Sequence, residues 1–201
     1  DLTVYTFHLR DGLKWSDGSD LTANDYVYSA LRVLTPATAG QYVNMISDYV
    51  VNAEEFYNGT ASAEDVGIKA VDDKTLEFTL KSPCPYFVDL VSMWVYFPVQ
   101  EATIEANGDK WTNQADTYIC NGPFKITDMK MGESVVLEKN ENYWDADNVT
   151  LQKLTYRYIL DTSTALTAYE NGEVDGVRTI PAIDLSRLEA DNAGVVTAPS
   201  Y

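Results

Sequence analysis

The stretch from Val4 to Leu34 constrains the fold more than any other part of the chain. Its first residues alternate, with Tyr5, Phe7 and Leu9 separated by polar residues, and a period of two predicts a half-buried strand. The two Asp-Gly pairs that follow predict turns, because glycine accepts a positive φ and aspartate bonds to nearby backbone. A second short extended segment is expected between these turns.

A helix is predicted directly after the second turn. Thr22 can cap its start, and Asp25 suits the positive end of the helix dipole. Leu31 and Leu34 lie at helical spacing along its apolar side, and Pro36 ends it. The stretch is therefore expected to fold as a strand, two turns and a helix.

The remaining chain mixes helical and strand patterns. The expected helices cover residues 42–50, 53–57, 86–91, 101–106, 164–171 (capped by Ser163) and 181–188. The expected strands cover 66–70, 76–80, 125–129, 135–139 and 154–160. Further extended segments are expected at 94–97, where the aromatic residues are assigned to the core, after Asp175, and from Val195. This order indicates a mixed α/β (α+β) architecture rather than a barrel or sandwich.

Charge and hydropathy exclude several classes of partner. The chain carries 14 basic and 31 acidic residues, a net charge of −17, and this field repels nucleic acid and anionic lipid surfaces. Apolar residues make up 45% of the sequence, which is enough for a substantial core. No apolar run approaches the roughly 20 residues that span a bilayer.

The sequence shows no catalytic or cofactor-binding motif. Its single histidine, His8, lies on the polar face of the first strand, so no Ser-His-Asp device is evident and no metal site is expected. No glycine-rich phosphate loop follows a strand. We therefore expect neither an enzyme nor a cofactor. A hydrolase built on paired carboxylates stays open as an alternative, because such pairs form in space rather than in sequence.

The opening motifs resemble a known family. The string YTFHLRDGLKWSDGSDLTANDYVYSALRVL is similar to the signature region of the oligopeptide-binding proteins, the extracytoplasmic solute-binding components of ABC peptide importers. Later landmarks of the family are matched at 66–76, at 85–87 and at 121–144, so the resemblance covers nearly the whole chain.

This resemblance implies a periplasmic-binding-protein-like fold of the class II type, present as two incomplete lobes. Residues 1–98 match most of the family's second lobe, and residues 99–201 match part of its first. The chain is expected to be an internal fragment of a longer protein, a cell-surface lipoprotein or a periplasmic protein, whose membrane anchor lies outside these residues. A third lobe, which supplies most groups that fix a peptide's ends, is outside them too.

The function implied is extracytoplasmic binding of oligopeptides for delivery to an ABC importer. The expected partners are an oligopeptide ligand and the importer's permease subunits, and the chain is expected to be a monomer. One alternative keeps the superfamily and changes the ligand to nickel, haem or an oligosaccharide. Another is a secreted, aromatic-rich interaction module without a transport function.

Tyr42 is the residue that the resemblance marks for ligand binding. The run from Arg32 to Tyr42 matches a family segment that places a tyrosine at the cleft. Its ring would pack on a ligand side chain and its hydroxyl would bond to the ligand backbone. The alternative is that Tyr42 belongs to the apolar stripe of the helix expected at 42–50.

Cys84 and Cys120 are the two cysteines of the sequence. In an oxidising compartment such a pair often forms a disulfide. A bridge closing this loop would stabilise the fold by about 3–4 kcal/mol. We expect the Cys84–Cys120 disulfide, with two free thiols as the alternative.

Overall fold

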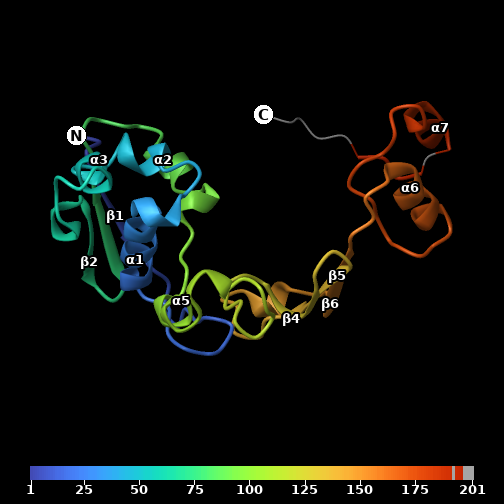
Figure 1. The fold of residues 1–201 in the computed structure, drawn as a ribbon, viewed down its shortest axis with the longest axis horizontal. Coiled ribbons are helices and arrows are strands. Elements are labelled where there is room, and N and C mark those ends of the chain that lie inside the picture. Colours follow the sequence, from blue (N-terminus) through green and yellow to red (C-terminus); the bar gives the residue numbers. More distant parts are fainter. Residues whose placement is uncertain (192, 197–201) are drawn as a thin grey trace. The chain divides into compact units, whose positions relative to one another are not determined.

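The computed structural model describes residues 1–191 and 193–196. Its helices are α1 (Ala23–Val33), α2 (Asn44–Ser47), α3 (Ala53–Tyr57), α4 (Phe87–Leu90), α5 (Glu101–Asn107), α6 (Thr162–Glu170) and α7 (Leu185–Ala190) (Figure 1). Its strands are β1 (Val4–His8), β2 (Ile68–Asp72), β3 (Thr75–Thr79), β4 (Phe124–Lys130), β5 (Ser134–Lys139) and β6 (Lys153–Arg157). The predicted mixture of helices and strands is confirmed.

The chain divides into two compact units. The first unit contains residues 1–129 and 136–155, and the second contains residues 130–135 and the chain from Tyr156 onward. None of the described helices combines the length and the apolar character needed to cross a membrane.

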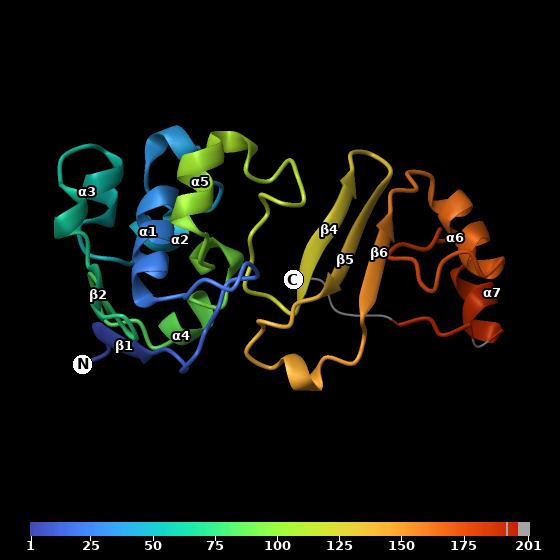
Figure 2. The same cartoon turned by 90° about the horizontal axis from the view of Figure 1, so that it is seen from below.

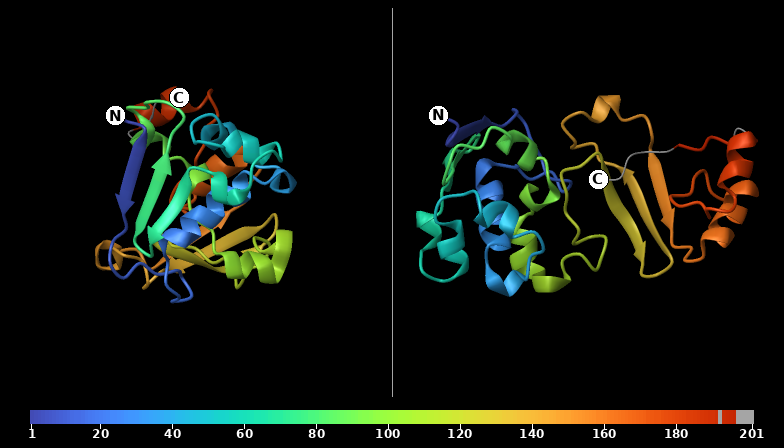
Figure 3. Two further views of the ribbon diagram at one scale, coloured as in Figure 1. Left: turned by 90° about the vertical axis from the view of Figure 1, so that its left-hand side faces the viewer. Right: turned by 90° about the horizontal axis from the view of Figure 1, so that it is seen from above.

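The first sheet has the strand order β1-β3-β2, and both pairs are antiparallel. The register places Tyr5 opposite Phe78 and Phe7 opposite Leu76, and Ile68 also lies opposite Phe78. Because side chains alternate along a strand, these apolar residues share one face of the sheet. The left view of Figure 3 shows helix α1 behind this sheet.

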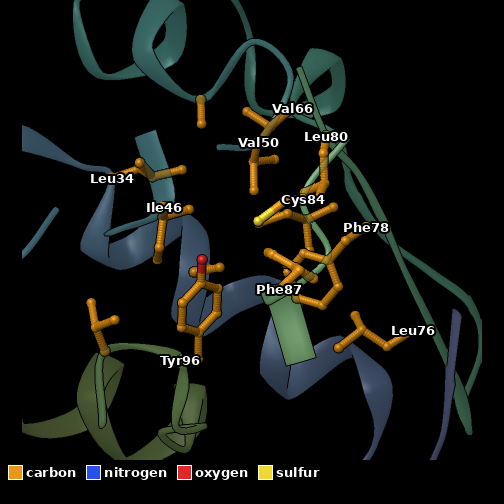
Figure 4. Close-up of a cluster of buried hydrophobic side chains, with 14 of the residues drawn as sticks. Leu34, Ile46, Val50, Val66, Leu76, Phe78, Leu80, Cys84, Phe87 and Tyr96 are labelled. Carbon is orange, nitrogen blue, oxygen red and sulfur yellow. The ribbon is translucent and has the colours of Figure 1, made fainter. Parts of the chain in front are cut away.

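Helix α1 starts where the sequence predicts. The backbone N–H of Thr22 donates to the Asp25 carboxylate over 2.7 Å, which satisfies a donor at the helix start. Its buried face includes Ala23 and Ala30. These side chains join the core of the first unit, where Phe78, Phe87 and Tyr96 lie close together (Figure 4).

A turn at residues 15–19 draws distant parts of the first unit together. Trp15 is only 1% exposed. The backbone N–H of Ser16 donates to the carbonyl of Cys120 over 2.7 Å, and the N–H of Cys120 donates to the Ser16 hydroxyl over 3.2 Å. The side-chain amide of Asn142 also donates to the Ser16 carbonyl over 3.3 Å. The Trp-Ser-Asp-Gly motif is thus a structural junction.

The second sheet has the order β4-β5-β6, which Figure 2 shows from below. Gly132, with φ 74°, lies in the turn between β4 and β5, where the left-handed backbone favours glycine. In the second unit, Leu166 of α6 and Leu188 of α7 are buried. Arg187 pairs with Glu170 over 2.8 Å, which links the two helices.

Several expected elements differ in the structure. The helix expected at 42–50 is reduced to α2, because Tyr42 has a positive φ that a helix excludes. Asp161, rather than Ser163, caps α6, since its carboxylate accepts the N–H of Thr164 over 2.8 Å. No strand follows Asp175 within the described residues, and Val195 and Val196 are not in a strand. The remainder of that expected strand lies outside the described residues.

The segment at 94–97 is also a correction. It forms a 3-10 turn, Trp94–Tyr96, and not an extended strand. Tyr96 is buried in the core, as expected, but Trp94 is 63% exposed and Phe97 is exposed as well. A 3-10 turn places residues three apart on the same side, which is why Trp94 and Phe97 both face solvent.

Candidate ligand-binding site

Tyr42 lies on the surface of the first unit, in the turn before α2. It is 44% exposed, so it does not belong to a buried helical stripe. Its carbonyl accepts the N–H of Met45 over 2.9 Å, which fixes the turn to the start of α2. The structure therefore presents the Tyr42 ring to solvent.

The Tyr42 ring meets a second exposed aromatic residue. The ring centroids of Tyr42 and Trp94 are 5.5 Å apart and their planes are inclined by 83°, an edge-to-face contact. We call these two residues the aromatic pair. The sequence marks Tyr42 for ligand binding but predicts a core position for Trp94. An aromatic-rich segment before a proline does not indicate which of its rings face solvent.

A buried tyrosine holds Trp94 in place. Tyr96, two residues further on, donates its hydroxyl to the Met45 carbonyl over 2.5 Å, and so ties the 3-10 turn to α2. The Tyr96 ring also packs edge-on against Phe78 and Phe87, each at 6.1 Å. Both members of the aromatic pair are thus anchored to α2, one through the backbone of Tyr42 and one through Tyr96.

The backbone at the aromatic pair is strained. Tyr42 has φ 60° and Ala39 has φ 49°, and both are residues that rarely adopt the left-handed conformation. Such a conformation costs roughly 1–2 kcal/mol per residue. The strain does not serve to bury Tyr42, because its ring is largely exposed.

Two tyrosines of the first unit, Tyr86 and Tyr96, have pKa values raised above the usual value. Burial is the main reason that the pKa of Tyr96 is raised, with Tyr49 and Cys84 contributing. A hydrogen bond with Tyr49 is the main cause that raises the pKa of Tyr86 to about 12. Tyr49 and Tyr86 also form an edge-to-face pair at 6.2 Å. Tyr96 uses its hydroxyl inside the core, whereas the exposed Tyr86 can offer a neutral hydroxyl to a ligand.

The described residues show no group of three or more potential metal ligands. His8, the only histidine of the sequence, is exposed on β1. What the aromatic pair offers chemically is stacking and hydrogen bonding, which suits binding.

The two cysteines are free in the structure and have different surroundings. Cys84 is buried in the core of the first unit, and its carbonyl accepts the hydroxyl of Tyr5 over 2.6 Å. Cys120 is half-buried, and its thiol donates to the Phe124 carbonyl over 3.3 Å. The structure therefore shows Cys84 and Cys120 as free thiols, and the Cys84–Cys120 disulfide stays a prediction from the sequence.

The chain is similar in sequence to known bacterial binding proteins. The model of the bacterial extracellular solute-binding proteins, family 5 Middle, matches residues 1–201. The oligopeptide-binding protein OppA of Bacillus subtilis is 43% identical over 198 residues, which are 96% of this chain and 36% of that protein. The periplasmic oligopeptide-binding protein OppA of Salmonella typhimurium is 39% identical over 176 residues, 87% of this chain and 32% of that protein.

Solved structures agree with these relatives. A periplasmic oligopeptide-binding protein of Borrelia burgdorferi, OppAIV, superposes with a TM-score of 0.90 at 41% identity and covers 94% of this chain and 38% of its own. OppA of Haemophilus influenzae in complex with the peptide RPPGFSPFR has a TM-score of 0.90 at 30% identity, covering 96% and 38%.

The chain spans about a third of the length of the curated relatives that it matches. The match to the structures confirms a partial periplasmic-binding-protein fold of mixed α/β type. By sequence and by structure, the chain belongs to family 5 of the bacterial extracellular solute-binding proteins, which places it outside the cytoplasm and in a family of binding proteins rather than enzymes.

Proposed function

We propose that this chain takes part in binding oligopeptides outside the cytoplasm for delivery to an ABC importer. The observation that carries the proposal is the aromatic pair. Both rings are exposed, both residues are anchored to α2, and Tyr42 has a strained, positive φ. Strained backbone at an exposed aromatic residue is often found at functional sites. The named relatives bind oligopeptides, which supports the same ligand class here.

Tyr42 packs against a ligand side chain in this proposal, and its hydroxyl bonds to the peptide backbone. Main-chain hydrogen bonds give affinity that is independent of peptide sequence, and hydrated pockets accept varied side chains. Residues 1–98 act as most of one lobe and residues 99–201 as part of another. The importer's permease subunits receive the ligand. The chain acts as a monomer without catalytic activity, and any membrane attachment lies outside these residues.

The ligand class can be tested by NMR titration of the 201-residue chain. A pool of short peptides is expected to shift the Tyr42 and Trp94 resonances, whereas a pool of oligosaccharides is not. Because the relatives are about three times as long, we expect peptide affinity weaker than about 1 μM. Submicromolar affinity would contradict the idea that residues outside this chain supply part of the binding site. A response to sugars alone would favour the oligosaccharide alternative.

The role of Tyr42 is tested by separating stability from binding. In Tyr42→Gly, relief of the positive φ offsets the lost ring contact, so the free energy of unfolding should change by less than about 1 kcal/mol. Peptide affinity should fall at least about tenfold, as measured by the same titration. Ala39→Gly relieves a positive φ three residues before Tyr42, at the end of the 3-10 turn 36–38, without removing a ring, and should leave affinity unchanged. Equal affinity in both variants would exclude Tyr42 from the site.

A further inference from the structure

A groove lies in the first unit at the end of β1, away from the residues of the aromatic pair. Its deeper part is a cavity of about 300 Å³, and a more open part of about 480 Å³ adjoins it. The two parts share Arg10, Lys14, Tyr143 and Trp144, so they form one continuous depression. The volume of the deeper part alone lies at the lower end of the range of small-molecule sites, about 300–1,000 Å³.

The deeper part of the groove has a mixed lining of polar and apolar side chains. Leu9, Leu13, Leu21 and Tyr26 form its apolar side, and Leu21 is almost fully buried. Trp144, which is 51% exposed, forms part of the lining of both parts. A ligand held here could place a compact apolar group against the apolar side and a polar group against the rest of the lining.

Arg10 supplies a positively charged group beside this apolar side. Its guanidinium lies over the Trp144 ring, 4.0 Å from the ring centroid. A guanidinium stacked in this way has one face covered and its N–H donors pointing outward in the ring plane. This geometry favours a carboxylate, which accepts two parallel hydrogen bonds from the edge of the guanidinium.

The charges around the groove make Arg10 the group available for a ligand. Asp11 is paired with Lys74, Lys14 with Asp20 over 2.5 Å, and Glu141 with Lys139 over 3.6 Å. Within the described part of the chain, Arg10 is the charged residue of the lining that has no ion-pair partner. Because no carboxylate among the described residues of the groove pairs with Arg10, its guanidinium is available to an anionic group of a ligand.

We propose that this groove binds a small carboxylate that carries a compact apolar group. The carboxylate bonds to the edge of Arg10, and the apolar group enters the cavity beside Leu9, Leu13 and Leu21. The side-chain amide of Asn121, which also lines the deeper part, is placed to bond to a polar group next to the carboxylate. This site is separate from the aromatic pair and does not depend on the function proposed for it.

The test uses N-acetyl-leucine as the ligand and N-acetyl-leucinamide as its uncharged match. NMR titration of the 201-residue chain at millimolar ligand is expected to shift the Trp144 indole and the Arg10 Nε–H signals. The amide should bind at least about tenfold more weakly, because it lacks the charge-assisted hydrogen bonds. Equal binding of the two compounds, or shifts confined to other residues, would overturn the proposal.

Two variants isolate the role of Arg10. Arg10→Gln should weaken N-acetyl-leucine binding by at least about tenfold and leave the weak binding of the amide unchanged. Arg178→Gln removes an exposed arginine of the second unit and is the charge-matched control, which should bind as the unchanged chain does. Full binding by Arg10→Gln would overturn the proposal. The comparison of acid and amide needs no substitution, so the test holds even if a variant folds poorly.

A third compound shows whether the carboxylate belongs to the end of a peptide or to a free small acid. 4-Methylpentanoate keeps the apolar group and the carboxylate but lacks the amide. Tighter binding of N-acetyl-leucine would indicate the carboxyl end of a peptide, and equal binding would indicate a free small carboxylic acid. Both results support the carboxylate site, and failure of both compounds to bind would contradict it.

Discussion

The carboxylate of Asp17 lies where the turn at residues 15–19 meets the start of α5. It accepts the backbone N–H of Ser19 over 2.9 Å, the Ser19 hydroxyl over 2.6 Å and the side-chain amide of Gln100 over 3.0 Å. Partial burial raises the pKa of Asp17, but the hydrogen bonds from Ser19 and Gln100 outweigh it and lower the pKa below 3.8. One carboxylate therefore couples a turn to a helix more than 80 residues away.

This lowered pKa predicts a pH dependence of stability. A carboxylate with a depressed pKa in the folded state stabilises the fold above its unfolded pKa, and this contribution is lost as the pH falls through the folded value. For Asp17 the loss occurs below about pH 4. Asp17→Asn should therefore lose less stability than the unchanged chain between about pH 7 and about pH 2.5, as measured by urea unfolding.

The exposed residue Asp147 provides the control for this experiment. Asp147→Asn should keep the full acid-induced loss of stability. An identical loss in the unchanged chain, Asp17→Asn and Asp147→Asn would show that the hydrogen bonds to Asp17 do not contribute.

Single residues also mark the limit of sequence-based prediction for the site. The family motif singles out Tyr42, but its positive φ and its contact with Trp94 depend on the packing of the turn, which no local pattern reveals. Asn140 lies in the loop between β5 and β6, where no periodic pattern singles it out. In the structure it is fully buried, and its side-chain amide donates to the Gly122 carbonyl over 2.8 Å. Its role becomes visible only when residues far apart in the sequence meet.

At the scale of elements, periodicity was most informative where an element lies between solvent and the core. The hairpin of β2 and β3 and the capped helix α1 were predicted because their apolar residues repeat at the spacing of a strand or a helix. The segment at 94–97 consists of four successive apolar or aromatic residues and has no such period. Its fold is decided by the hydrogen bond of Tyr96 with α2, a contact between elements that the sequence does not encode locally.

Helix α4 offers an element-scale prediction. Phe87 is fully buried and its ring packs against Tyr5 at 5.0 Å and Phe78 at 5.3 Å, whereas the neighbouring Val88 is 56% exposed. Phe87→Ala should lower the free energy of unfolding by about 3–5 kcal/mol, because it removes apolar contacts and leaves a cavity. Val88→Ala should change it by less than about 0.5 kcal/mol. Chemical denaturation measures both, and similar values would contradict this account of the core.

At the scale of the whole molecule, the two units differ in how much core they contain. In the first unit, a large cluster of buried residues joins the sheet, α1 and the short helices. Among the described residues of the second unit, the buried apolar side chains are Leu166, Ala168 and Leu188. Fewer buried contacts mean a smaller free energy of local opening.

Hydrogen exchange is the measurement that tests this difference. Amides in α6 and α7 should exchange faster than those in β3 and α1, because the second unit opens at a lower free energy. Leu166→Ala should accelerate exchange in α6 and α7 and leave β3 unchanged. Equal protection in both units, or acceleration that spreads to β3, would show that the chain opens as a single cooperative body.

The junction at residues 15–19 has a practical consequence for dissecting the protein. A shortened chain ending at Pro98 would keep β1–β3 and α1, but it would lack Gln100, Cys120 and Asn142, which satisfy the polar groups of that junction. Cutting the chain at the boundary that the family resemblance implies would thus remove the later hydrogen-bond partners of the Trp-Ser-Asp-Gly motif. A cut after residue 142 preserves all three, which makes it the sounder place to shorten the chain.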